Sequence, residues 1–221
     1  MKTYTVLIID DHPIIAEAYK FALNKLSLDS KELDFSVEML TNCDDVLDYI
    51  KTQKTADLIF LDMKLPPSLD GKFLSGEDLG IELREKLPEA RIIVSTTYND
   101  NYRVNNILKS INPEGFLVKN DITPKDLMAA IKTILDDTPY YSQTVLKLLR
   151  THVNHDFFLD KIDRQLLYEL SLGTKMVDLP KILPLSLSGV ERRKRQIKEI
   201  FDIQKEPDRV LVAMAKEKGF I

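Results

Sequence analysis

The segment TVLIIDDHP, residues 5–13, decides the fold of this chain. Its apolar run is rich in Val and Ile and ends at two acids and a proline, a pattern typical of a strand that is buried on both faces of a sheet. The adjacent carboxylates of Asp10 and Asp11 repel each other, so a divalent cation with oxygen ligands is expected between them. The alternative is that both acids only cap the helix that follows Pro13.

Apolar segments and helical patterns alternate through the first 137 residues. Further strands are expected at residues 35–40, 57–62, 91–97 and 115–119, and helices at residues 14–26, 44–49, 77–86, 100–110 and 125–135. Because parallel strands need right-handed crossover helices, this alternation predicts an α/β fold with a five-stranded, parallel, doubly wound sheet.

Polar side chains stand at the carboxyl ends of the predicted strands, where such sheets bind ligands. Asp10 and Asp11 follow the first strand, and the later strands end at Asp62, Thr96 and Lys119. Three acids, a hydroxyl and an ammonium at one edge are unfavourable for stability but suit a metal ion and a phosphoryl group. The alternative is that each is an ordinary polar strand end.

This set of residues resembles the receiver domain of two-component response regulators, which has the CheY-like, flavodoxin-like fold. The resemblance covers residues 5–135 and rests on Asp10, Asp11, Asp62, Met63, Lys64, Leu65, Pro66, Thr96, Phe116 and Lys119. It implies that a sensor histidine kinase phosphorylates Asp62, the phosphoacceptor. It also implies that Mg²⁺ is held by Asp10, Asp11, Asp62 and the backbone carbonyl of Lys64.

The same resemblance implies a switch. Lys119 would pair first with Asp62 and then with a phosphoryl oxygen, while Thr96 turns toward the phosphoryl group and Phe116 moves inward behind it. The negative charge of the phosphoryl group would thereby shift Thr96 and Phe116 from one arrangement to the other. Residues 66–76 form a longer connection than is usual here, and they either shape kinase recognition and phosphate lifetime or are a tolerated surface insertion.

Composition predicts a second, smaller domain with a different charge. The 221 residues carry a net charge of −4, yet residues 151–221 contain 13 basic and 11 acidic side chains. The single cysteine, Cys43, cannot form an internal disulfide, and no apolar run is long enough to cross a bilayer, so a cytoplasmic protein without a membrane partner is expected. We expect a receiver at 1–137, a linker with a helix at 138–155, and a DNA-binding domain at 156–221.

The second domain has four short helical patterns, at residues 161–172, 175–183, 186–201 and 207–218. The third is cationic and amphipathic, the form that lies in a DNA major groove. This half resembles the NarL/LuxR-type helix-turn-helix output domain, from which a homodimer is expected. Candidate contacts to double-stranded DNA are Ser186, Ser188, Glu191, Arg192, Arg193, Lys194 and Arg195.

Two positions depart from that output family, and two histidines near the domain boundary raise the question of a metal site. Pro180 would bend a helix unless the helix begins late, and Gly189 lowers helix propensity. His152 and His155 are interpreted as solvated linker residues rather than as metal ligands, because no cysteine lies near them.

The resulting hypothesis is a response regulator that is phosphorylated on Asp62 and regulates transcription by binding DNA, without being an enzyme. One alternative is a receiver-controlled regulator that acts through protein contacts and does not bind DNA. Another is an aspartate-dependent phosphohydrolase. Such enzymes generally have two acids on one strand with one residue between them, whereas Asp10 and Asp11 are adjacent.

Overall fold

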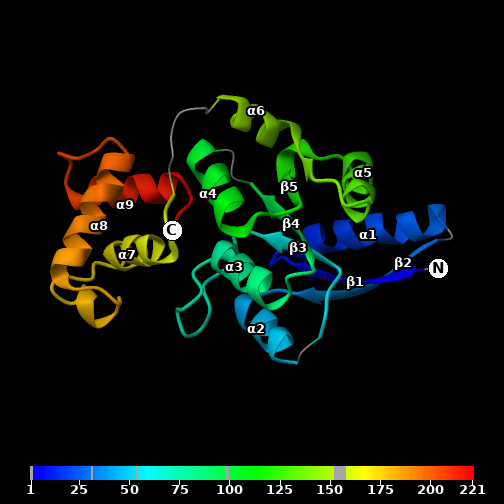
Figure 1. The fold of residues 1–221 in the computed structure, drawn as a ribbon, viewed down its shortest axis with the longest axis horizontal. Coiled ribbons are helices and arrows are strands. Elements are labelled where there is room, and N and C mark those ends of the chain that lie inside the picture. The colour runs from blue at the N-terminus through cyan, green and yellow to red at the C-terminus, as the bar shows by residue number, and fades with distance from the viewer. Residues whose placement is uncertain (1, 31, 53, 98–99, 152–157) are drawn as a thin grey trace. The chain divides into compact units, whose positions relative to one another are not determined.

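The computed structural model describes residues 2–30, 32–52, 54–97, 100–151 and 158–221. Two compact units are present: Met1–Asn99 with Ser110–Thr151, and Asp100–Lys109 with His152–Ile221 (Figure 1). Within the described ranges, no helix is long and apolar enough to cross a membrane. The interpretation of His152 and His155 as linker residues concerns positions outside the described residues.

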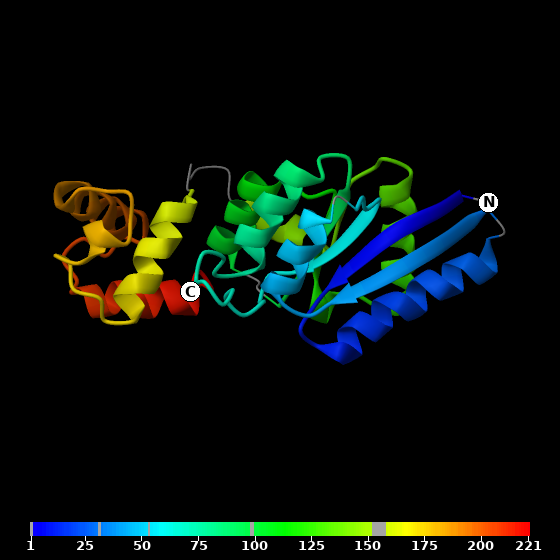
Figure 2. The same cartoon turned by 90° about the horizontal axis from the view of Figure 1, so that it is seen from below.

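The first unit is built on a parallel sheet with the strand order β2-β1-β3-β4-β5-β6. Figure 2 shows β1 and β2 side by side, with α1 running along them. The strands are β1 (Lys2–Ile9), β2 (Leu33–Leu40), β3 (Leu58–Asp62), β4 (Arg91–Thr96), β5 (Gly115–Val118) and β6 (Tyr140–Tyr141). The predicted α/β doubly wound fold is confirmed.

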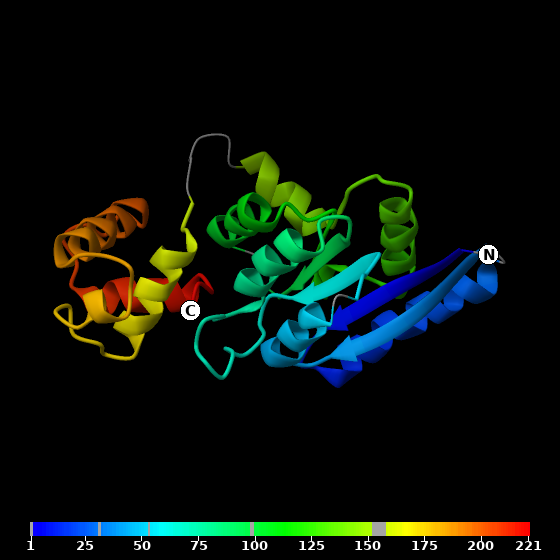
Figure 3. The same cartoon turned by 60° about the horizontal axis from the view of Figure 1, so that its bottom comes forward.

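Helices cover both faces of this sheet. Residues Val6, Ile8 and Phe60 pack against α1 and α5, whereas their neighbours Leu7 and Leu61 are buried toward the opposite face. In Figure 3, α1 lies behind the strands while α2 and α3 lie in front of them. The helices are α1 (Pro13–Asp29), α2 (Cys43–Lys51), α3 (Gly76–Lys86), α5 (Pro124–Leu135) and α6 (Gln143–Thr151), and α4 (Asn101–Ile111) begins in the second unit and ends in the first.

The sheet has six strands, so the prediction of five was wrong. Tyr140 and Tyr141 pair with Gly115 and Phe116 as a short parallel strand, although the sequence indicated only a turn-rich join. The Tyr140 N–H donates to the Glu114 carbonyl at 2.9 Å. Two residues are too few to show a strand's alternation, which is why the pattern was missed. Residues 138–151, predicted to belong to the linker, therefore lie in the first unit.

The second unit is helical. Besides most of α4, its helices are α7 (Lys161–Ser171), α8 (Leu187–Ile200) and α9 (Asp208–Glu217). Leu166, Val190 and Leu211, one from each helix, are buried in a common core. The Asn106 side chain belongs to this unit through two hydrogen bonds with the backbone of Leu159, donating to its carbonyl at 3.2 Å and accepting from its N–H at 2.7 Å.

The predicted helix at residues 175–183 is not formed. The chain makes turns there, with a single 3-10 segment, Leu179–Lys181. Pro180 is the physical reason, because its ring and missing N–H are tolerated in the first turn of a helix and oppose an α-helix around it. The element preceding α8 is thus shorter than the helix of the output family that this half resembles.

Gly76, the first residue of α3, lies against the backbone of Asp62. A Cβ atom at this position would be 1.8 Å from the Asp62 carbonyl oxygen. We predict that Gly76→Ala lowers the free energy of unfolding by about 2 kcal/mol, because the backbone at the end of β3 must shift. Chemical denaturation measures the change.

Gly189→Ala is the matched control. Gly189 lies in α8, and a Cβ atom there would meet no neighbour closer than 3.4 Å, so its replacement is expected to stabilise the second unit by about 0.5 kcal/mol. Equal stability of Gly76→Ala and the unmodified chain would contradict the close approach.

Candidate functional site

Three side chains that are distant in sequence meet at the carboxyl edge of the sheet. Asp10 follows β1 and Asp62 ends β3, and the pairing of Ile9 with Leu61 places these acids side by side. Lys119, which follows β5, places its Nζ atom 2.8 Å from Oδ2 of Asp10 and 2.9 Å from Oδ2 of Asp62. The predicted convergence of strand ends is present in the structure.

This ion cluster is buried. Asp10 and Asp62 are 1% and 2% exposed, and the Lys119 side chain is 10% exposed. Burial raises the pKa of Asp62, an effect that the neighbouring Lys119 ammonium opposes and the Asp10 carboxylate reinforces. The Lys64 N–H also donates to Oδ1 of Asp62 at 3.2 Å, which holds the carboxylate in place. Such a site favours charge compensation by additional cations.

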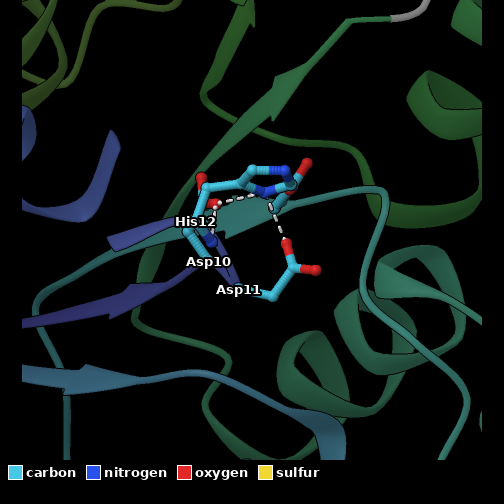
Figure 4. Close-up of side chains that lie close together, drawn as sticks. Asp10, Asp11 and His12 are labelled. Carbon is cyan, nitrogen blue, oxygen red and sulfur yellow. Dashed lines mark hydrogen bonds and ion pairs between the residues drawn. The ribbon is translucent and has the colours of Figure 1, made fainter. Parts of the chain in front are cut away.

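His12 is a member of the site that the sequence reasoning missed. Its Nδ1 atom lies 2.6 Å from Oδ1 of Asp11, 3.4 Å from Oδ1 of Asp10 and 4.0 Å from Oδ2 of Asp62. Figure 4 shows the imidazole between the two acids that precede it. The available signal was its place in the chain, directly after Asp11, where a polar side chain must lie near the strand end.

The donor atoms of this cluster fit a magnesium ion. Ligand atoms of Asp10, Asp11, His12 and Asp62 all lie within 4.8 Å of one another. Three carboxylates face one lysine ammonium, which leaves an excess of negative charge. Moreover, Oδ2 of Asp62 is buried and accepts no hydrogen bond of normal geometry from the described residues, although Lys119 is its ion-pair partner. Hard carboxylate oxygens are the ligands that Mg²⁺ prefers.

The two predicted switch residues lie beside this cluster in the sheet. Thr96 ends β4 directly after Ser95, the register partner of Asp62, and Phe116 lies in β5 opposite Val94. Both side chains are fully buried. The structure therefore places Thr96 near the acidic edge and Phe116 within the packing of the sheet.

A hydroxyl pair next to the site was also missed. The Tyr19 hydroxyl of α1 and the Ser95 hydroxyl share a 2.5 Å hydrogen bond, and the Tyr19 ring stacks on Phe60 at 4.7 Å between ring centroids. Burial raises the pKa of Tyr19 above its ordinary value. Helical spacing marked Tyr19 as a core residue, and only the fold shows that its hydroxyl reaches β4.

The loop at residues 66–76 is held by its own hydrogen bonds. Ser68 and Phe73 bond through their backbones at 2.8 Å, and the Ser68 hydroxyl donates to Asp70 at 2.8 Å. The Leu69 side chain is exposed at its tip. This ordered geometry is compatible with both interpretations of the loop.

In the second unit, the candidate DNA contacts divide into two groups. Ser186, Ser188, Glu191, Arg192 and Arg195 are exposed, and the Ser186 hydroxyl also caps α8 by accepting from the Gly189 N–H at 3.2 Å.

The other two candidates face neighbouring helices. Arg193 forms ion pairs of 2.7 Å with Asp160 and 2.8 Å with Asp163, and Lys194 forms one of 2.8 Å with Asp208. The Arg193 and Lys194 side chains are thus paired with acids of the same unit.

Comparison with known families identifies the first unit. Residues 6–132 match the family model described as the response regulator receiver domain. The chain belongs to this family. The response regulator is 23% identical to the oxygen regulatory protein NreC of Staphylococcus haemolyticus and 24% identical to NreC of Staphylococcus epidermidis. In each case the match covers 96% of this chain and 97% of the relative.

Solved structures of similar fold cover both units of the response regulator. RcsB from Salmonella enterica serovar Typhimurium, bound to promoter P1flhDC with the phosphomimetic BeF₃⁻, has a TM-score of 0.67 and 20% identity, covering 96% of this chain and 98% of RcsB. Another structure of RcsB from Salmonella typhimurium has the same TM-score and identity and covers 99% of both chains. The response regulator thus shares the fold of these RcsB structures over both of its units.

Asp62→Asn should stabilise the metal-free response regulator, because it removes a buried charge. The pKa of Asp62 is raised in the folded state, so its cost is present at neutral pH and disappears as the pH falls through that pKa. The stability difference between the variant and the unmodified chain is therefore expected to narrow on acidification, as measured by denaturation at several pH values.

Stabilisation by Mg²⁺ should also differ between the unmodified chain and Asp62→Asn. At ten times its dissociation constant, Mg²⁺ should stabilise the unmodified chain by about 1.4 kcal/mol, and the variant much less. Equal stabilisation of both would contradict the assignment of Asp62 as a metal ligand.

Proposed function

We propose that the chain is a phosphorylation-controlled transcription regulator, in which a sensor histidine kinase transfers a phosphoryl group to Asp62. The observation that carries this proposal is the placement of the Lys119 ammonium between Asp10 and Asp62 at the sheet edge. An aspartate that is buried among charges, beside a lysine that can follow a new negative charge, suits an acceptor of phosphoryl groups.

Each residue of the site has a separate task. A carboxylate oxygen of Asp62 forms the new bond to phosphorus while the bond from phosphorus to the kinase histidine breaks. Asp10, Asp11, Asp62 and the Lys64 carbonyl would hold Mg²⁺, which neutralises charge on the phosphoryl oxygens when it is bound. Lys119 would transfer its contact from Asp62 to a phosphoryl oxygen, since a compact ammonium pairs readily with either group.

The switch would continue from Thr96 toward the output domain. Thr96 would turn its hydroxyl to the phosphoryl group, and Phe116 would occupy the space this movement frees. Asp100, four positions after Thr96, begins the segment of the chain that packs in the second unit. A change at the end of β4 therefore has a short covalent route to the helical unit.

Regulation of transcription by DNA binding is supported by the relatives and by α8. Similar structures of RcsB are complexes with DNA or with a promoter. The exposed Arg192 and Arg195 side chains of α8 are suited to guanine edges and phosphates. A homodimer is proposed on the same basis, since one RcsB structure is described as two dimers on DNA.

Two observations favour a second candidate function, regulation through protein contacts without DNA. The element before α8 is a single 3-10 turn, and Arg193 and Lys194 are engaged in ion pairs. Fewer free cations and a shorter supporting element both weaken phosphate binding.

Modification of the receiver tests the phosphoacceptor. Acetyl phosphate with Mg²⁺ should add one phosphoryl group to the unmodified chain and none to Asp62→Asn, as measured by intact mass. Asp70→Asn, in the loop at residues 66–76, removes an exposed acid and should remain fully reactive. Reaction of Asp62→Asn at the unmodified rate would show that the phosphoacceptor lies elsewhere.

Titration with duplex DNA tests the output domain. Affinity is expected to fall steeply with salt, because each phosphate contact releases counterions, and Arg192→Ala with Arg195→Ala should reduce the salt slope by about 2. Arg209→Ala with Lys216→Ala removes the same charge from exposed positions on α9 and serves as the control. Unchanged binding by the α8 variant would remove this helix from the DNA-binding surface, and absence of DNA binding by the unmodified chain would support the protein-contact candidate.

A further inference from the structure

The imidazole of His12 lies at the edge of the acidic site, where its Nδ1 atom is 2.6 Å from Oδ1 of Asp11. His12 precedes α1 in an extended conformation, and its side chain makes no capping hydrogen bond. The backbone N–H of His12 donates to Oδ1 of Asp10 at 2.9 Å, and Pro13 restricts the backbone on the other side. The side chain is 62% exposed, so its position follows from the backbone rather than from packing.

The spacing of His12 from the carboxylates matches the spacing of metal ligands. Two ligand atoms about 2.1 Å from an octahedral ion lie roughly 3 Å apart when adjacent and roughly 4.2 Å apart when opposite. Nδ1 of His12 lies 4.0 Å from Oδ2 of Asp62, near the opposite separation, and 3.4 Å from Oδ1 of Asp10, a distance that would shorten toward the adjacent separation on binding one ion. Its 2.6 Å contact with Asp11 is shorter and would lengthen when both atoms bind one ion.

A second observation points into the same space. Oδ2 of Asp62 is buried, has the Lys119 ammonium 2.9 Å away as its ion-pair partner, and belongs to a carboxylate that is grouped with His12 among the possible metal donors. The ammonium of Lys119 offsets only one of the three carboxylates. A divalent cation at this point would meet both unsatisfied charge and a nitrogen donor.

We propose that Nδ1 of His12 is a ligand of the cation site, so that the site selects a first-row transition cation such as Mn²⁺ over Mg²⁺. This proposal rests on the proposed function, since it assigns a nitrogen ligand to the same site. The neutral imidazole would carry its proton on Nε2 and bind the metal through Nδ1. The Asp11 oxygen that now contacts Nδ1 would contact the ion instead.

The nitrogen donor is what separates the two metals. Mg²⁺ prefers oxygen ligands and retains its water, so replacing one water by imidazole gains it little. Manganese accepts the carboxylates as Mg²⁺ does and gains more from imidazole, in keeping with the order of affinities among divalent metals. Removal of His12 should therefore change Mn²⁺ binding and leave Mg²⁺ binding nearly as it was.

Pulsed electron paramagnetic resonance of the full chain with bound Mn²⁺ tests the ligand directly. The unmodified chain should show modulation from a coordinated ¹⁴N nucleus, and His12→Ala should lose it. His152 and His155 remain in that variant, so a signal that they cause would persist. Because His12 is exposed, the variant is expected to fold, which thermal denaturation verifies.

Binding titrations give an independent measure. We expect His12→Ala to weaken Mn²⁺ binding about tenfold and to change Mg²⁺ binding less than about twofold. Absence of ¹⁴N modulation in the unmodified chain, or equal Mn²⁺ affinity of both proteins, would overturn the role of His12.

Asp62→Asn separates this failure from that of the proposed function. If Mg²⁺ binds the unmodified chain and not Asp62→Asn, the acidic site stands even where His12 proves not to be a ligand. If Asp62→Asn binds both metals as the unmodified chain does, the site assignment and the role of His12 fail together.

Discussion

A buried ammonium between two buried carboxylates is the interaction on which the first unit depends. Lys119 connects the ends of β1, β3 and β5 through contacts below 3 Å with Asp10 and Asp62. Loss of Lys119 would leave the two buried carboxylates without a counter-ion, at a cost of about 3–5 kcal/mol. The same cluster keeps an excess of negative charge, so the arrangement that closes the sheet edge also creates the demand for a cation.

The first unit was predictable from sequence because its signals are local. Apolar runs ending in Asp10, Asp62 and Lys119 mark strands, and parallel topology alone brings their ends together. The sixth strand lacked such a signal, since Tyr140 and Tyr141 are stabilised by pairing with β5 rather than by any periodicity. His12 was missed because its relevance depends on a distance to Asp62, which no spacing along the chain encodes.

The second unit shows where counting charges along a helix is insufficient. The sequence predicted a cationic, amphipathic α8 with Arg193 and Lys194 among its DNA contacts, yet these two side chains and Lys198 pair with acids. Those acids, Asp160, Asp163 and Asp208, come from residues before or within other helices, so only the folded unit reveals the pairing. The α8 helix itself was predicted correctly, while Pro180 shortened the preceding element to a 3-10 turn.

A crystal structure of the full chain with Mg²⁺ and BeF₃⁻ tests the central claim most directly, because it locates the cation, the phosphoryl mimic and Lys119 together. The account predicts BeF₃⁻ on Asp62, the cation bound by carboxylates of the acidic cluster, and Lys119 moved from Asp62 to a fluorine atom. A mimic bound at another residue, or Lys119 still bridging Asp10 and Asp62 beside an unmodified carboxylate, would contradict it.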